Sequence, residues 1–160
     1  MKKQKGFSLI ELLIVVAIIG IIAAIAIPNL LNARRSANES ATAGNMRTVV
    51  SGEFSYANTN NTYGTLANLQ TAGNIDSSFT TASTTTSPKS GYVFADSDVA
   101  ANTYAVLAYR ATSGAGTRDF GAIEDGALRE NNSTTITTTC SRTTISGWTG
   151  YGTVSSSSGS

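Results

Sequence analysis

The chain has 160 residues, only 13% of them charged, and a formal net charge of +1. It contains no histidine and a single cysteine, Cys140, so an intramolecular disulfide is excluded and too few ligands remain for a cysteine–histidine metal site. The near-neutral charge balance gives no bulk indication of nucleic-acid binding. We expect no metal site and no cofactor.

The N-terminal region has the composition of a membrane segment. Between Phe7 and Ile27 the only charged side chain is Glu11. Twenty-one helical residues span roughly 30 Å, which is the thickness of the hydrocarbon core of a bilayer. Three lysines at positions 2, 3 and 5 precede this run, and the sequence turns polar directly after Pro28. The pattern predicts a membrane-spanning helix joined to a soluble remainder, with the lysines on the cytoplasmic side.

A secretory signal peptide and an ordinary single-pass membrane anchor each explain only part of this N-terminal region. A cleaved secretory signal would have the same cationic start, and Ala24–Ala26 offers a weak small-x-small cleavage site, but the apolar run is long for that class. An ordinary single-pass anchor has the right length. However, a carboxylate such as Glu11 inside a spanning helix costs on the order of 3 kcal/mol, and a plain anchor has no use for it.

The stretch KGFSLIELL, residues 5–13, closely resembles the class III leader junction of type IV prepilins. That resemblance implies a basic leader, residues 1–6, that a prepilin peptidase cuts after Gly6 on the cytoplasmic side. It also implies that Phe7 becomes the new N-terminus and is N-methylated, and that the apolar helix is retained. A carboxylate at the position of Glu11 is typical of the family.

The physical chemistry of this junction is consistent with assembly. Cleavage after Gly6 would create a cationic amine on Phe7, one helical turn before Glu11. An amine and a carboxylate that are each costly in an apolar bundle offset one another when they meet, so Glu11 of one subunit pairing with the Phe7 amine of a neighbour would fix the register of a filament. The alternative is that Glu11 extends toward the lipid headgroups.

The helical pattern continues beyond the membrane segment, so we expect one long helix from Phe7 to about Asn58. Pro28 cannot donate a backbone hydrogen bond, which predicts a kink near it. The helix then divides into a transmembrane and filament-core part, residues 7–28, and an amphipathic part, residues 29–58. The second part carries an apolar face at helical spacing, suited to packing on a sheet: Met46, Val49, Val50, Phe54 and Ala57.

Residues 59–154 are expected to form a globular head. Strand patterns occur at residues 91–95, 103–109, 119–123 and 127–129, with a hairpin turn at 124–126. Residues 76–90 are expected to be a Ser/Thr-rich loop, residues 133–140 a further strand, and residues 155–160 a disordered tail. The predicted fold class is α+β, with a small antiparallel sheet of three or four strands covering the second half of the helix, as in pilins.

Candidate sites for chemistry are weak. Ser87 and Lys89 could form a Ser–Lys dyad, but a solvated loop is the favoured interpretation. Asp96 and Asp98 could bind calcium weakly, although two acids do not complete a site and a turn is favoured. Cys140 could cross-link subunits, but a buried thiol is the commoner state. We therefore expect no enzymatic activity.

The favoured hypothesis is a structural subunit of a type IV pilus, made as an inner-membrane precursor and assembled into a surface filament for adhesion, motility or DNA uptake. Its expected partners are other copies of itself, the inner membrane, the prepilin peptidase and methyltransferase, and the pilus assembly platform. A pseudopilin of a type II secretion system and a minor tip adhesin or DNA-binding pilin are the alternatives. The head carries no basic patch, which argues against nucleic-acid binding.

Overall fold

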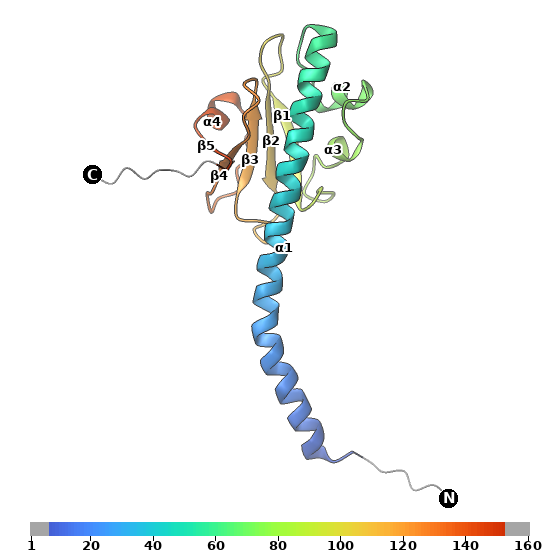
Figure 1. The fold of residues 1–160 in the computed structure, drawn as a ribbon, viewed down its shortest axis with the longest axis vertical. Helices are drawn as coiled ribbons and strands as arrows, with labels where there is room; N and C mark the ends of the chain where they lie inside the picture. Colours follow the sequence, from blue (N-terminus) through green and yellow to red (C-terminus); the bar gives the residue numbers. More distant parts are fainter. Residues whose placement is uncertain (1–6, 153–160) are drawn as a thin grey trace, which may run out of the picture. The chain divides into compact units, whose positions relative to one another are not determined.

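The computed structural model describes residues 7–152. Within this range, helices and strands follow one another in the order α1, α2, α3, β1, β2, β3, β4, α4, β5 (Figure 1). The chain divides into two compact units, with the boundary between Arg34 and Arg35. The predicted leader, residues 1–6, and the predicted disordered tail, residues 155–160, lie outside the described residues.

Helix α1 runs without interruption from Leu9 to Asn60, a length of 52 residues. The helix begins two residues later than predicted, at Leu9 instead of Phe7, and ends two residues later than predicted, at Asn60 instead of about Asn58. The helix ends where Asn61 adopts a left-handed backbone conformation (φ 56°) and donates its N–H to the carbonyl of Ala57 at 2.9 Å, a common way of satisfying the last carbonyls of a helix. Pro28 lies inside the helix without ending it, and the kink there stays a prediction.

Within residues 7–152 the five strands form one antiparallel sheet in sequence order. They are β1 (Tyr92–Ser97), β2 (Ala105–Arg110), β3 (Asp119–Ile123), β4 (Arg129–Asn131) and β5 (Thr149–Gly150). The predicted α+β class and antiparallel sheet are confirmed. The expected three or four strands become five because the C-terminal segment adds the two-residue β5 at the edge.

The predicted hairpin turn joins β3 to β4. Gly126 has a φ of 72°, a conformation that favours glycine, and its N–H donates to the carbonyl of Ile123 at 2.9 Å. A Cβ at this position would also lie 2.8 Å from Cε2 of Phe54 on α1. Glycine is therefore required here both by the turn and by the close approach of the helix.

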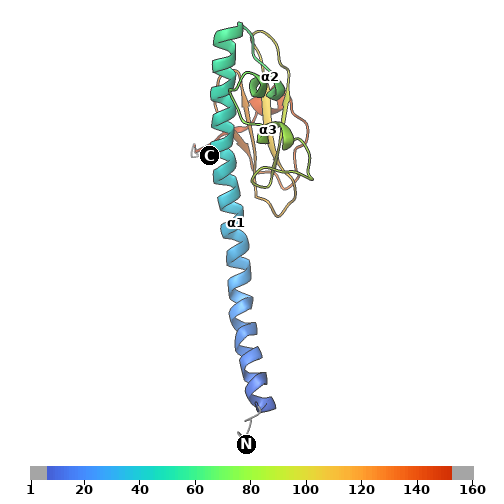
Figure 2. The same cartoon turned by 90° about the vertical axis from the view of Figure 1, so that its right-hand side faces the viewer.

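The main core lies between the sheet and the second half of α1 (Figure 2). Phe94, Ala108 and Phe120 form one row across β1, β2 and β3, so a small residue lies between two aromatic ones. Met46 and Val49 of α1 are fully buried in this core. The predicted packing of the helix on the sheet is confirmed, because the 3.6-residue period of the helix and the two-residue period of the strands place apolar side chains against each other.

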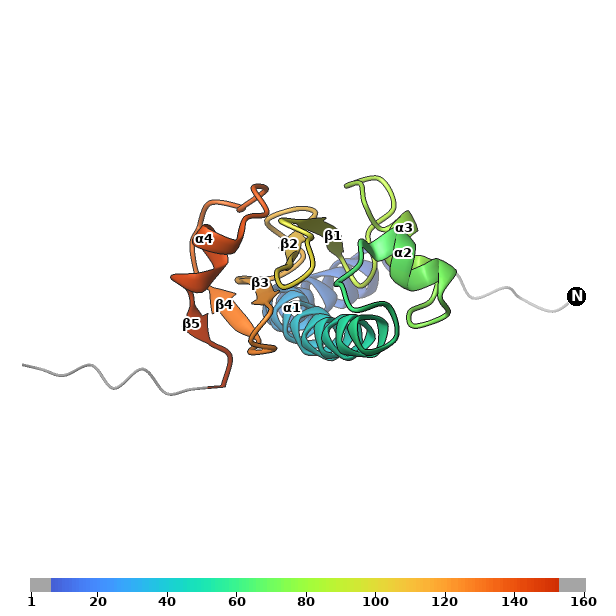
Figure 3. The same ribbon diagram turned by 90° about the horizontal axis from the view of Figure 1, so that it is seen from above.

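A smaller apolar cluster covers the opposite face of the sheet. Leu107 and Ile123 pack there against Ile145 of α4 (Arg142–Ser146), and Cys140 and Trp148 pack at the margin. A Cβ at Gly121 would lie 2.9 Å from the Ile145 side chain, so α4 sits directly on β3. Figure 3 shows α4 beside β4 and β5, and α2 and α3 at the β1 edge. The sheet is therefore covered on both faces, by α1 on one and by α4 on the other.

Two short helices lie in the region between α1 and β1. Helix α2 (Leu66–Thr71) is capped by Thr65, whose hydroxyl accepts from the N–H of Asn68 at 3.2 Å. Helix α3 (Ser78–Thr81) lies inside the segment 76–90 that was predicted to be loop, so that prediction is wrong in part. Burial of Phe79 in the main core orders this turn in spite of the Ser/Thr-rich sequence.

The predicted strand at residues 133–140 is wrong. The segment has no ladder to a neighbouring strand, and its backbone is bound instead by side chains of the sheet. Arg110 donates to the carbonyl of Ser133, and Ser97 donates to the carbonyl of Cys140, both at 2.8 Å. Threonine-rich composition indicates an extended backbone, but whether that backbone joins a sheet depends on partners that are distant in sequence.

Candidate assembly site

The first half of α1 presents an apolar surface that nothing in its own unit covers. Every large hydrophobic side chain from Leu9 to Leu31 is at least 48% exposed. The most apolar window of the helix has a mean hydropathy of 3.1 and no buried residue, so by length and composition it can cross a membrane. A helix that is apolar on all sides requires lipid or other helices around it. This segment is therefore the candidate assembly site.

Glu11 interrupts this surface in the first turn of α1. Its side chain is exposed and makes no hydrogen bond or ion pair with any residue between 7 and 152. The N-terminal end of a helix dipole favours a carboxylate at this place, but the remaining charge requires a partner in an apolar environment. Phe7, four residues earlier, is 84% exposed and precedes the helix, whereas Gly6 lies outside the described residues.

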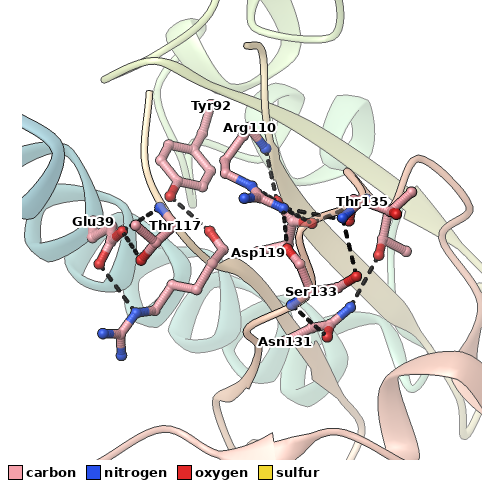
Figure 4. Close-up of polar contacts among 10 residues, drawn as sticks. Glu39, Tyr92, Arg110, Thr117, Asp119, Asn131, Ser133 and Thr135 are labelled. Carbon is pink, nitrogen blue, oxygen red and sulfur yellow. Dashed lines mark hydrogen bonds and ion pairs between the residues drawn. The ribbon is translucent and has the colours of Figure 1, made fainter. Parts of the chain in front are cut away.

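Two polar clusters in the head hold elements together that are distant in sequence (Figure 4). In the first, the carboxylate of Glu39 on α1 accepts from both the N–H and the hydroxyl of Thr117. The guanidinium of Arg118 lies 3.0 Å from Glu39 and 2.6 Å from Glu130 of β4. The Tyr92 hydroxyl donates to the carbonyl of Arg118 at 2.7 Å, and burial raises the pKa of this tyrosine. The cluster ties α1 to the β2–β3 turn and to β4.

The second cluster is a buried ion pair between Arg110 of β2 and Asp119 of β3. Arg110 is 4% exposed and Asp119 is fully buried. The Arg110 Nε donates to Asp119 Oδ1 at 2.9 Å, and the backbone N–H of Thr137 donates to Oδ2 at 3.0 Å. Because Arg110 also donates to the carbonyl of Ser133, the pair fastens the 133–137 segment to the sheet in a chain that has no disulfide.

Glu53 is a buried carboxylate on the sheet-facing side of α1. It is 1% exposed and accepts one hydrogen bond, from the N–H of Gly64 at 3.1 Å. Its Oε1 and the hydroxyl of buried Tyr104 have no hydrogen-bond partner among the described residues. Desolvation by burial raises the pKa of Glu53 to about 7. Glu53 therefore changes charge near neutral pH inside the head.

The weaker candidates for chemistry are in structural positions. Lys89 pairs with Asp76 and lies 4.4 Å from the centre of the Phe79 ring, which accounts for its charge without a Ser–Lys dyad. The Cys140 thiol is half-buried and lies 3.5 Å from the carbonyl oxygen of Ala105; burial raises its pKa to about 11. Within residues 7–152 no three acidic or cysteine side chains gather closely enough to hold a metal ion.

The structure does not bring the predicted site residues into contact with one another. Glu11 and Pro28 lie 17 residues apart on α1 and Phe7 precedes the helix, and their predicted roles involve other molecules. Sequence reasoning missed the Arg110–Asp119 pair and the burial of Glu53. The available signal was a charged residue at an inward position of an apolar pattern, as at Glu53, four residues after Val49.

Comparison with known proteins gives a consistent set of relatives. Residues 1–27 match the family described as the prokaryotic N-terminal methylation motif. The chain is 49% identical over 63 residues, 39% of its length, to the type IV wide pilus major component PilA4 of Thermus thermophilus, covering 48% of that protein. It is 41% identical over 66 residues to the type IV major pilin protein PilA of Myxococcus xanthus, covering 41% of this chain and 30% of the relative.

A shorter sequence match has a higher identity. Over 28 residues, 18% of this chain and 18% of the relative, the identity to a fimbrial protein of Pseudomonas aeruginosa is 86%. The chain thus spans about half the length of the Thermus relative and less than a third of the Myxococcus relative. The identity is therefore higher over the short match than over the two longer ones.

Proposed function

We propose that the chain is a type IV pilin, that is, a structural subunit of a type IV pilus filament, and its matches to the N-terminal methylation motif and to major pilins support this. One observation carries this proposal: the first half of α1 exposes about 33 Å of apolar helix, from Leu9 to Leu31, on a chain whose residues 35–152 form a head with its own core. Such a helix is stable in a bilayer and equally in a bundle of identical helices. A fibre subunit needs both environments in turn.

The proposed maturation begins in the inner membrane. A prepilin peptidase cuts between Gly6 and Phe7 and a methyltransferase modifies the Phe7 amine. Removal of the leader takes away three lysines and leaves eight basic and ten acidic side chains. The mature chain then starts with a cationic amine directly before the exposed apolar helix.

Glu11 is proposed to set the register of assembly. In the filament core its carboxylate would meet the Phe7 amine of a neighbouring subunit, and a misplaced subunit would leave both charges unpaired in an apolar environment. Leaving one member of such a pair unpaired costs about 3 to 5 kcal/mol, so the pair selects one arrangement even though its net contribution to stability is small. The lack of any partner for Glu11 between residues 7 and 152 supports this role.

The proposed destination is a filament on the cell surface, extruded by the pilus assembly platform and used for adhesion, motility or DNA uptake. The relatives bear the names of major pilins and fimbrial proteins, which favours a fibre subunit over a secretion pseudopilin. Clusters such as Glu39–Thr117–Arg118 would transmit tension between α1 and the head, because they join the two by charge-assisted hydrogen bonds.

The test is the intact mass and N-terminal sequence of this protein in fibres sheared from cells. A dominant species that begins at N-methylated Phe7 supports a processed major pilin. A processed form that stays in the envelope and is missing from sheared fibres would instead favour a pseudopilin or a minor subunit. A chain that retains Met1, or that starts after Ala26, would refute processing as a pilin.

A further inference from the structure

The basic side chains of the described residues fall into two groups. From Lys89 onward, every one of them takes part in an ion pair within the head: Lys89–Asp76, Arg110–Asp119, Arg118–Glu39 and Arg118–Glu130, Arg129–Asp125, and Arg142–Glu124. The three arginines of α1, Arg34, Arg35 and Arg47, take part in none. Arg47 is stacked 5.6 Å from the centre of the Tyr151 ring, which leaves Arg34 and Arg35 without a partner among residues 7–152.

These two arginines follow the apolar surface at a defined distance. The exposed apolar side chains end at Leu31, about 33 Å of helix after Leu9, which matches the roughly 30 Å hydrocarbon core of a bilayer. Arg34 lies three residues farther along, about 4 to 5 Å, and its side chain is exposed. That distance corresponds to the headgroup layer, where the phosphates are.

The acid nearest to Arg35 along the helix is already engaged. Glu39 is one turn away, at the spacing where an arginine and a glutamate usually interact on a helix surface. Glu39 is only 9% exposed, and its carboxylate is bound by Thr117 and Arg118. The intervening Asn38 donates its amide to the carbonyl of Ala115 at 2.9 Å. The helix itself therefore offers Arg35 no carboxylate.

We propose that Arg34, together with Arg35, binds the phosphate of an anionic phospholipid at the non-cytoplasmic surface of the membrane. A planar guanidinium presents paired N–H donors that match two phosphate oxygens, and a cation in this layer gains from anionic lipid. The contact would hold the chain at a fixed depth before assembly. This inference rests on the membrane-anchored stage of the proposed function and not on the fibre.

The alternative partner is an acidic side chain of a second copy, and the charges of the head argue against it. Six carboxylates between residues 7 and 152 are already in ion pairs with basic side chains of the same chain. Of the others beyond the apolar segment, Glu53 is buried and Asp96 is half-buried. Asp98 accepts from the backbone N–H of Arg142 at 2.7 Å. A neighbouring head thus offers few free carboxylates.

The experiment measures which lipid surrounds the full chain in phosphatidylcholine bilayers. Trace spin-labelled phosphatidylglycerol or phosphatidylcholine is added, and the relative association constant of the two labels is obtained from electron paramagnetic resonance spectra. We expect phosphatidylglycerol to be preferred, and the preference to fall roughly fivefold for each arginine removed in R34Q/R35Q. R47Q is the matched control, since Arg47 lies on the same helix but in the head; it should keep the wild-type preference.

Each other outcome has a defined meaning. If K2Q/K3Q/K5Q abolishes the preference and R34Q/R35Q does not, the leader lysines bind the lipid and the inference is overturned. If R34Q/R35Q leaves lipid association unchanged but weakens cross-linking between copies, the arginines pair with a second chain and the inference is again overturned. If inorganic phosphate abolishes the preference for phosphatidylglycerol and chloride of equal ionic strength does not, the arginines bind free phosphate and the inference is overturned.

Failure of the proposed function is distinguishable from failure of this inference. A full chain that does not insert into any of the bilayers contradicts the membrane-anchored stage and the lipid contact together. A full chain that inserts normally but shows no preference for phosphatidylglycerol contradicts the lipid contact alone.

Discussion

The most informative perturbation of the head is Glu53→Gln. The Glu53 carboxyl is 1% exposed, accepts one hydrogen bond, and has one oxygen without a partner among residues 7–152. Glutamine keeps the shape and an acceptor for the N–H of Gly64, and it removes the charge. Its amide also supplies donors near the Tyr104 hydroxyl, which likewise has no partner among the described residues.

The sign and size of the effect follow from the pKa. Burial raises the pKa of Glu53 to about 7 in the folded chain, whereas an unfolded glutamate has a pKa of about 4.3. The folded state therefore binds the proton more tightly. The stabilising contribution is fully present below about pH 4 and is lost as the pH rises through about 7; the whole difference is about 4 kcal/mol. Glu53→Gln should match the wild type below about pH 4 and exceed its unfolding free energy by up to about 4 kcal/mol at pH 8.

The assay is urea unfolding of the full chain in detergent micelles at pH 5, 6.5 and 8. The fluorescence of Trp148 reports on the head, because it is the chain's only tryptophan and packs at the margin of the cluster on the outer face of the sheet. The chain has no histidine, so few other groups titrate in this range. Asp96, whose pKa is also raised by burial and whose charge acts on Glu53, is tested in parallel as Asp96→Asn.

Glu124→Gln is the matched control. The bond from Arg142 lowers the pKa of Glu124, so this carboxyl stays charged through the whole range and the variant should keep the pH dependence of the wild type. Equal stability of the wild-type chain at pH 5 and pH 8 would show that the Glu53 carboxyl is hydrated and has the pKa of an exposed glutamate. A Glu53→Gln variant that is less stable at every pH would show that the charge itself is favourable, and the argument from burial would fail.

Three further predictions concern single contacts. Asp119→Asn leaves the buried guanidinium of Arg110 without its counter-charge and should lower the unfolding free energy by about 3 to 5 kcal/mol in the same Trp148 assay. Gly121→Ala places a Cβ 2.9 Å from Ile145 and should cost about 1 to 3 kcal/mol in that assay. Glu11→Ala should reduce the yield of sheared fibres while leader cleavage, followed by intact mass, continues.

Each of these variants has a control in the same chain. Asp125→Asn breaks an exposed ion pair with Arg129 and should cost no more than about 1 kcal/mol. Gly114→Ala meets nothing closer than 3.8 Å and should be nearly neutral. Ser8→Ala changes the same region as Glu11 without removing a charge, so its fibre yield should be normal. If a control has as large an effect as its partner, the proposed contact is not the cause.

The sequence by itself determined the features that depend on local order along the chain. The apolar run from Phe7 to Ile27 with its single carboxylate, the long helix, and the strand at 119–123 all follow from composition and periodicity within a few turns or residues. The hairpin turn at Gly126 was also predictable from the sequence, because two acidic residues followed by glycine favour a tight turn with a positive φ at the glycine.

Only the tertiary structure decided which polar residues are buried and what covers the outer face of the sheet. Residues 133–140 join no ladder, and their backbone is bound instead by the side chains of Arg110, Asp119 and Ser97. Glu53 lies on the apolar side of α1, four residues after Val49, but it is the packing of this side against the sheet that buries its carboxylate. These outcomes depend on contacts between residues 11 to 43 positions apart, and a local sequence pattern carries no information about which distant residue will be the partner.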